Sequence, residues 1–233
     1  MIKHKGVFIA GTGTSVGKTL VCGCLARFLK MRGVRIGVQK WVSTGNKEIS
    51  NDMAFCSSML SEPLQSLHPM SLISPYTFAY PASPHLAAEL EGTTINEDRI
   101  IQSYRDLSKH YELLLVEGTG GVMVPLTRDS LFIDIVARLK LPTLIVSLSG
   151  LGTINHTLLT IEALRTRDIP ILGVVFNLTG REDPIIENDN SIVISQIGRV
   201  KNFGLLPQKN TREELIEAFE PIGERILDAV KNL

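Results

Sequence analysis

A glycine-rich loop between an apolar strand and an amphipathic helix constrains the fold of this chain more than any other feature of its sequence. The loop occupies residues 11–19 (GTGTSVGKT) and follows an apolar run at residues 7–10. Apolar side chains then recur at i, i+3, i+4 and i+7, at Val21, Cys24, Leu25 and Phe28. Strand, glycine loop and helix in this order predict a phosphate-binding loop at the start of an α/β fold.

The chemistry of this loop suits the phosphates of a nucleotide. Successive backbone N–H groups and a helix N-terminus, with about half a positive charge from the helix dipole, converge on one point. We expect Lys18 to reach the β- and γ-phosphates and the Thr19 hydroxyl to bind Mg²⁺. Thr12 departs from the usual glycine pattern, so the loop is a variant, and the alternative is a glycine-rich turn with an incidental lysine. The predicted nucleotide-binding residues here are Ser15, Val16, Gly17, Lys18, Thr19 and Leu20.

The composition is that of an ordinary globular protein. The 233 residues are 44% hydrophobic and 21% charged, and 24 basic residues balance 24 acidic ones. A neutral chain without a basic block gives no electrostatic reason to expect nucleic acid or a membrane surface as a partner. No apolar stretch approaches the ~18–20 residues that span a bilayer, and residues 1–5 lead into a strand, so we expect a cytoplasmic protein. Three cysteines predict neither a disulfide framework nor a four-ligand zinc site, and we interpret them as packing residues.

Strands and helices alternate along the whole sequence. Besides the first strand, strands are predicted at residues 34–40, 111–116, 142–148, 171–176 and 203–206. Helices are predicted after the glycine loop, from residue 51, at 85–91, 96–108 and 131–139, from residue 153, at 191–200, and after a capping box at 211–214. Residues 69–84 and 181–190 are expected to be irregular. This order predicts one domain over residues 1–233, with a mainly parallel sheet, helices on both faces and a P-loop NTPase-like fold.

Several polar residues stand where predicted strands end, and in such a sheet ligands bind beyond the carboxyl ends of the strands. Lys40 ends one strand, although a lysine there could also extend to the solvent. Glu117 ends another before a glycine-rich stretch, which favours Mg²⁺ binding over a solvated carboxylate. Asp52 could be a helix-dipole partner or a metal ligand, and Asn177 could contact a base edge or cap a turn. A glycine turn before Thr153 offers a second helix N-terminus to an anion.

From the residues alone, we expect a magnesium–nucleotide phosphoryl-transfer enzyme with an anionic co-substrate. Beyond this, long segments of the sequence resemble the ATP-dependent dethiobiotin synthetases of biotin biosynthesis. The matching segments are residues 11–19, 40–45, 51–52, 75–78, 83–85, 116–126, 152–156, 177 and 204–207. The stretch VEGTGGVMVPL at residues 116–126, together with SPH at 83–85, is more specific than the phosphate loop.

The resemblance implies a homodimer that uses 7,8-diaminononanoate, CO₂ and MgATP to form dethiobiotin, ADP and phosphate. A carbamate of the substrate is phosphorylated by ATP, and the second amine then closes the ring. Lys18, Lys40 and Thr14 are the implied catalytic residues, and Thr19, Asp52 and Glu117 the implied Mg²⁺ ligands. Further implied substrate-binding residues are Thr44, Gly118, Thr153 and Asn155, the last two on a helix contributed by the neighbouring subunit. Gly120, Asn177, Pro207, Gln208 and Lys209 complete the implied nucleotide site, and the last four are expected to hold adenine.

The chain departs from the family pattern at a few positions. Members often have proline where Trp41 stands, and an acidic residue at the position of Gly13 or Ser15. Two alternatives remain: a nucleotide-switched ATPase of the chromosome-partitioning or division-site type, and a catalytically idle regulatory domain of the same fold. The switch ATPases usually carry an additional lysine near the position of Thr12. An idle regulatory domain would not need Lys18, Lys40, Asp52 and Glu117 together.

Overall fold

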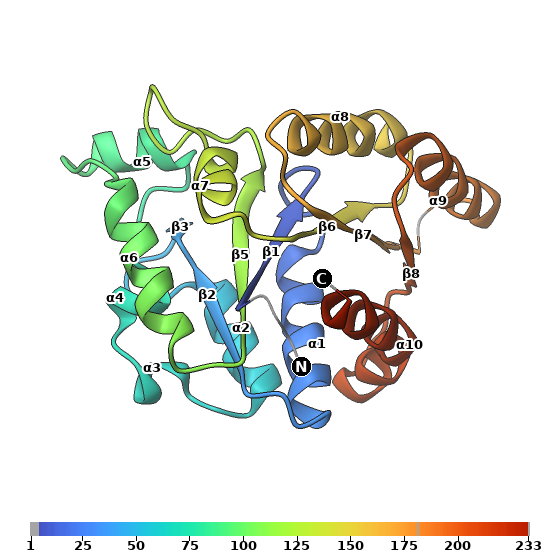
Figure 1. Ribbon diagram of the computed structural model, residues 1–233, viewed down its shortest axis with the longest axis horizontal. Helices are drawn as coiled ribbons and strands as arrows, with labels where there is room; N and C mark the ends of the chain where they lie inside the picture. Colours follow the sequence, from blue (N-terminus) through green and yellow to red (C-terminus); the bar gives the residue numbers. More distant parts are fainter. Residues whose placement is uncertain (1–4, 181, 233) are drawn as a thin grey trace.

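A six-stranded parallel sheet forms the centre of the computed structural model, which describes residues 5–180 and 182–232 (Figure 1). The strand order is β2-β5-β1-β6-β7-β8, and every neighbouring pair is parallel. The strands are β1 (Gly6–Gly11), β2 (Ile36–Lys40), β5 (Leu113–Gly121), β6 (Thr143–Leu148), β7 (Ile171–Asn177) and β8 (Asn202–Leu206). A separate two-stranded parallel sheet pairs β3 (Val42–Thr44) with β4 (Tyr76–Phe78).

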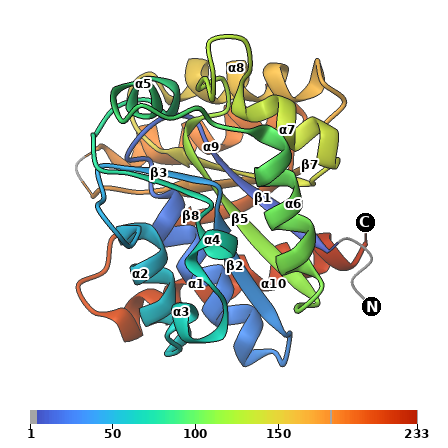
Figure 2. The same ribbon diagram turned by 90° about the vertical axis from the view of Figure 1, so that its left-hand side faces the viewer.

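Helices cover both faces of the sheet (Figure 1). The helices are α1 (Lys18–Met31), α2 (Asn51–Leu60), α3 (Leu64–Leu67), α4 (Met70–Ile73), α5 (Pro84–Leu90), α6 (Glu97–Ser108), α7 (Phe132–Leu139), α8 (Thr153–Arg165), α9 (Pro184–Gly198) and α10 (Arg212–Lys231). From the side of the β2 edge, α2, α4 and α6 are seen around this strand, and all three contact it (Figure 2). None of the helices in the described part of the chain is long and apolar enough to cross a membrane.

Alternation along β1 explains why the protein has two hydrophobic cores. Val7 and Ile9 point into the core formed with α1, α2 and α10, whereas Phe8 and Ala10 point into the core formed with α6, α7 and α8. Successive strand side chains point to opposite faces, so a strand apolar at every position must be covered on both. This arrangement confirms the predicted α/β class with a mainly parallel sheet and helices on both faces.

The structure corrects three sequence predictions. Residues 181–190 are not a loop throughout, because α9 already begins at Pro184, where the Asp183 side chain accepts a capping hydrogen bond from Ile185 N. The strand predicted at residues 111–116, with Glu117 at its end, continues to Gly121, where it still pairs with β1. Residues 69–84, predicted to be irregular, contain α4 and β4. Expectations for residues 1–4, 181 and 233 lie outside the described residues.

Candidate functional site

The loop between β1 and α1 has the backbone geometry of an anion-binding turn. Ser15 and Gly17 adopt left-handed conformations, with φ of 58° and 99°. A side chain at Gly17 would be strained, because φ is positive there and its Cβ would lie 2.3 Å from Asn177 Nδ2. Asn177 Nδ2 in turn donates a hydrogen bond to Val16 O at 3.2 Å. The asparagine at the end of β7 therefore supports the loop, so its amide N–H is engaged by the chain itself.

Lys18 folds back over this loop. Its ammonium donates a hydrogen bond to Gly13 O at 2.7 Å, and the residue is only 7% exposed. Burial, followed by repulsion from the Lys40 ammonium, lowers the pKa of Lys18 from 10.5 to about 8. Negative charge placed in the loop would counteract both causes, which is what a bound phosphate would supply.

Four side chains from four elements meet beside the loop: Lys40 at the end of β2, Asp52 in the first turn of α2, Glu117 in β5 and Thr19 in α1. Lys40 Nζ lies 2.5 Å from Asp52 Oδ2 and 2.9 Å from Glu117 Oε1. Thr19 Oγ1 lies 2.8 Å from both Asp52 Oδ1 and Glu117 Oε1. The parallel register pairs Lys40 directly with Glu117, so the sheet fixes the centre of this group.

The charges of this group depend on one another. Burial opposes the charged form of Lys40, but Glu117 and Asp52 outweigh it and raise the pKa of Lys40. Burial also opposes ionisation of Asp52, yet Lys40 and the Thr19 hydroxyl hold the pKa of Asp52 below its usual value. Burial raises the pKa of Glu117, and Lys40 only partly counteracts this. In the free protein Lys40 is therefore the principal counter-ion of two carboxylates.

The oxygen atoms of this group fit a magnesium ion. The Thr19 hydroxyl has a single hydrogen and two carboxylates at equal distance, so it can donate to only one of them at a time. The second oxygen of Glu117, Oε2, is buried and has no hydrogen-bond partner among the described residues. Carboxylate and hydroxyl oxygens are the ligands that Mg²⁺ prefers.

A cavity of about 540 Å³ joins the loop to this group. Its lining consists of Thr14, Ser15, Gly17, Lys18, Thr19, Leu20, Lys40, Ser43, Thr44, Asn51, Asp52, Phe55, Glu117, Thr119 and Gly120. Sequence reasoning did not select Ser43, Asn51, Phe55 or Thr119 for the site. Phe55 follows Asp52 by three residues on α2, so helical spacing could have found it. Ser43 belongs to the segment after Lys40 that was expected on this edge of the sheet, and its neighbour Thr44 was selected.

Other predicted residues lie outside this lining. The Thr153 hydroxyl is buried and contacts the hydroxyls of Ser147 at 2.6 Å and Thr157 at 3.4 Å, so only the backbone and its exposed neighbour Asn155 remain for a ligand. Gly118 O lies 3.4 Å from Lys40 Nζ, next to the cavity.

The residues predicted to hold adenine lie next to one another. Residues 207–209 follow β8, whose last residue pairs with Asn177 at the end of β7. Leu178 N also donates to Leu206 O at 2.9 Å. The roles of all these residues stay predictions.

Trp41 anchors the strand end that carries Lys40. It is fully buried, with ring centroids 5.6 Å from Phe8 and 5.9 Å from Phe132. Its indole N–H donates to Gln39 Oε1 at 3.0 Å, and Gln39 Nε2 donates to Leu72 O at 2.7 Å. Trp41, which stands where family members often have proline, is therefore a packing residue that does not line the cavity.

Transfer of a phosphoryl group is favoured by cations around the phosphate, and this cavity supplies Lys18 from the start of α1 and Lys40 from the end of β2. The fold and the cavity thus define a P-loop enzyme that uses a nucleotide.

A family model described as an AAA domain matches residues 5–214. The ATP-dependent dethiobiotin synthetase BioD of Anaeromyxobacter dehalogenans (strain 2CP-C) is 38% identical over 87% of this chain and 90% of the relative. The enzyme of the same name from Chlorobaculum tepidum is 39% identical over 89% of this chain and 87% of the relative. The chain belongs to the ATP-dependent dethiobiotin synthetase family, whose members are ligases.

Solved structures support the fold and no more than the fold. A ParA family ATPase from Chlorobium tepidum TLS superposes with a TM-score of 0.57 at 13% identity, covering 99% of this chain and all of the other. The Aquifex aeolicus MinC:MinD cell division complex gives a TM-score of 0.60 at 15% identity, with 98% and 95% coverage. The sequence relatives therefore decide between the synthetase and the switch-ATPase alternatives in favour of the synthetase.

Proposed function

We propose that this chain is a single-domain, cytoplasmic dethiobiotin synthetase that joins 7,8-diaminononanoate to CO₂ at the expense of ATP. The observation that carries the proposal is the convergence of Lys18, Lys40, Asp52 and Glu117 on one cavity. The reaction brings a carbamate, a triphosphate and their metal together, and such crowding of negative charge needs this density of cations and N–H dipoles.

The reaction divides into three steps. An amine of the substrate adds to CO₂ and loses a proton, which gives a carbamate. A carbamate oxygen attacks the γ-phosphorus of ATP, and ADP leaves. The second amine attacks the carbonyl carbon of the resulting mixed anhydride, and phosphate leaves as the cyclic urea closes.

In this scheme Lys18 and Lys40 neutralise the γ-phosphate and the carbamate as charge passes between them. The hydroxyls of Thr14 and Thr44 line the same cavity and are available to the carbamate and the diamine. Thr19, Asp52 and Glu117 would hold Mg²⁺, which when bound screens the charge of the phosphates. The carboxylates would then no longer rely on Lys40, whose ammonium would be left for the reacting anions.

Two further binding regions are part of the proposal. Asn177 and residues 207–209 would hold adenine, and their position beyond the ends of β7 and β8 supports this. The carboxylate of the substrate would bind at the N-terminus of α8, at Thr153 and Asn155 of a second subunit. Support for a homodimer comes from Met123, Leu151 and Leu159, which are 50%, 84% and 60% exposed near this helix. Three reduced cysteines and the use of ATP support the cytoplasmic location.

Turnover of the purified protein tests the proposal. With diaminononanoate, bicarbonate and MgATP it should form dethiobiotin, ADP and phosphate in equal amounts. Lys40→Met should abolish product formation while keeping binding of a non-hydrolysable ATP analogue. Lys109→Met is the matched control, because Lys109 is exposed and pairs only with Asp106 among the described residues. Normal turnover by Lys40→Met would contradict the role of Lys40, and hydrolysis stimulated by DNA or lipid without response to the diamine would contradict the synthetase.

A further inference from the structure

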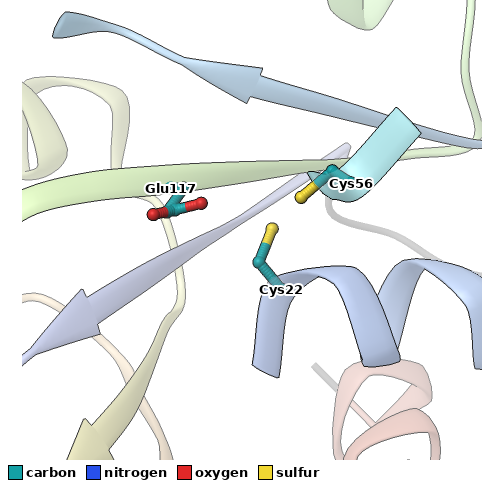
Figure 3. Close-up of side chains that lie close together, drawn as sticks. All are labelled: Cys22, Cys56 and Glu117. Atoms are coloured by element: carbon teal, nitrogen blue, oxygen red, sulfur yellow. The ribbon is translucent and has the colours of Figure 1, made fainter. Parts of the chain in front are cut away.

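Two thiols and a carboxylate form a buried group beneath the candidate magnesium site. Cys22 of α1, Cys56 of α2 and Glu117 of β5 each bring one sulfur or oxygen atom within 4.8 Å of the other two. The sulfur atoms point toward each other, and one oxygen of Glu117 points toward them (Figure 3). Both cysteines are 0% exposed and Glu117 is 1% exposed. Packing alone, as expected for the cysteines from sequence, does not explain why a carboxylate faces them.

Glu117 has one engaged oxygen and one without a partner. Oε1 contacts Thr19 and Lys40, whereas Oε2 is buried and accepts no hydrogen bond from any described residue. A buried acceptor without a donor is unfavourable, because it has lost its hydrogen bonds to water without replacement. A buried carboxylate beside two thiols, with one of its oxygens left without a donor, is thus a set of potential metal ligands.

We propose that Cys22, Cys56 and Glu117 bind a thiophilic divalent cation of the Zn²⁺ and Cd²⁺ class, and that this cation inhibits the enzyme. Binding replaces the two S–H bonds by two metal–sulfur bonds and releases two protons, without oxidation or reduction. One divalent cation thus exchanges for two protons, so the net charge of the buried group does not change. The inhibitory part of the proposal rests on the proposed function, because it requires Glu117 to serve the magnesium site.

The geometry suits this class of ion. Zinc binds sulfur at about 2.3 Å and carboxylate oxygen at about 2.0–2.2 Å in a tetrahedron, so two sulfurs and one oxygen lie about 3.5–3.8 Å apart. The three atoms already lie within 4.8 Å, so side-chain movements on the order of 1 Å bring them to that spacing. Soft thiolates select zinc-like ions, whereas Mg²⁺ prefers oxygen, so the two adjacent sites differ in the ions they accept.

Inhibition follows from the carboxylate that the two sites share. Glu117 lines the 540 Å³ cavity and also belongs to the thiol group, so the two sites meet at this carboxylate. A cation held by the sulfurs draws Glu117 away from Thr19 Oγ1 and Lys40 Nζ, which now lie 2.8 and 2.9 Å from its Oε1. The predicted magnesium ligands would then lose one carboxylate.

Titration of the reduced, metal-free protein with Cd²⁺ alone tests the site. Thiolate–Cd²⁺ bonds give an ultraviolet charge-transfer band, which should saturate at one ion per chain. Cys22→Ser and Cys56→Ser should each lose most of this band. Cys24→Ser is the matched control, because Cys24 lies on the same helix and is 2% exposed but does not belong to the group. Glu117→Gln keeps both thiols and should bind Cd²⁺ at least tenfold more weakly, so a serine variant that does not fold leaves the test intact.

Each outcome decides part of the proposal. If the wild-type protein gives no band, or if all three serine variants give the same band, the site is refuted. With the site occupied, dethiobiotin formation should fall at least tenfold in the wild type and in Cys24→Ser but not in Cys56→Ser. A band without loss of turnover would refute the inhibition. Absence of turnover in the metal-free enzyme supplied with MgATP would instead refute the proposed function, while the band still decides the site.

Discussion

Replacement of Lys40 by methionine should destabilise the protein because it leaves two carboxylates without their shared counter-ion. Methionine keeps most of the buried stem and removes only the charge. Lys40 lies 2.5 Å from Asp52 and 2.9 Å from Glu117, and the side chains of Lys40 and Glu117 are 5% and 1% exposed. Loss of one partner from a buried ion pair costs about 3–5 kcal/mol. The side chain of Asp52 is 31% exposed, so most of the cost should come from Glu117.

Thermal and urea unfolding measure this cost. A loss of about 3–5 kcal/mol corresponds to a decrease in Tm of about 6–20 °C for a chain of this length. Lys109→Met, which removes an exposed ion pair, should change stability by less than about 1 kcal/mol. The double variant Lys40→Met/Glu117→Gln should be more stable than additive losses predict, by about 0.5–3 kcal/mol, because no unpaired carboxylate remains at Glu117.

Magnesium extends the test to the candidate site. If Lys40 and Mg²⁺ neutralise the same carboxylates, MgCl₂ should raise the Tm of Lys40→Met more than that of the wild type, at equal ionic strength set with NaCl. An equal response of both proteins would refute the competition between Lys40 and the cation. A loss of stability below about 1 kcal/mol would refute the assignment of Lys40 as the buried counter-ion.

Three further predictions concern the loop, the core and the buried lysine. Gly17→Ala should weaken ATP binding at least tenfold, measured by calorimetry, because φ is positive at Gly17 and the new Cβ would clash with Asn177. Gly13→Ala should not weaken binding, because its Cβ would meet only Val16 at 3.9 Å. Equal affinities of the two variants would contradict this prediction. Trp41→Ala should cost about 3–5 kcal/mol in urea unfolding, and a loss under 1 kcal/mol would mean that its stacking does not support the strand end. Between about pH 8 and 10.5 the unfolded chain holds a proton on Lys18 that the folded protein has released. The free energy of unfolding of the nucleotide-free protein should therefore gain a contribution that grows with pH, and Lys18→Met should remove it. Identical pH profiles of the wild type and Lys18→Met would contradict the lowered pKa of Lys18.

Local signals in the sequence predicted much of the fold. The order of strand, glycine loop and helix at residues 6–31 is the order found, and the capping box at Thr211 and Glu214 starts α10 as expected. The start of α9 was missed because the charged residues 181–190 were interpreted as a loop, although Asp183 and Pro184 are an N-cap and first-turn proline. The extension of β5 was missed because glycines usually end strands. Here they permit close packing, since a Cβ at Gly118 would lie 2.8 Å from the Phe8 ring.

The sequence by itself determined the phosphate loop, the parallel α/β class and the charged residues at the strand ends, because these depend on spacing and on the constant direction of parallel strands. Only the tertiary structure decided that Lys40 is bound between Asp52 and Glu117, that Asn177 supports the loop, and that Cys22 and Cys56 face the carboxylate of Glu117. The residues joined by these contacts are 12 to 161 positions apart along the chain. Their distances and burial are set by how α1 and α2 pack against the sheet, and no local pattern encodes that packing.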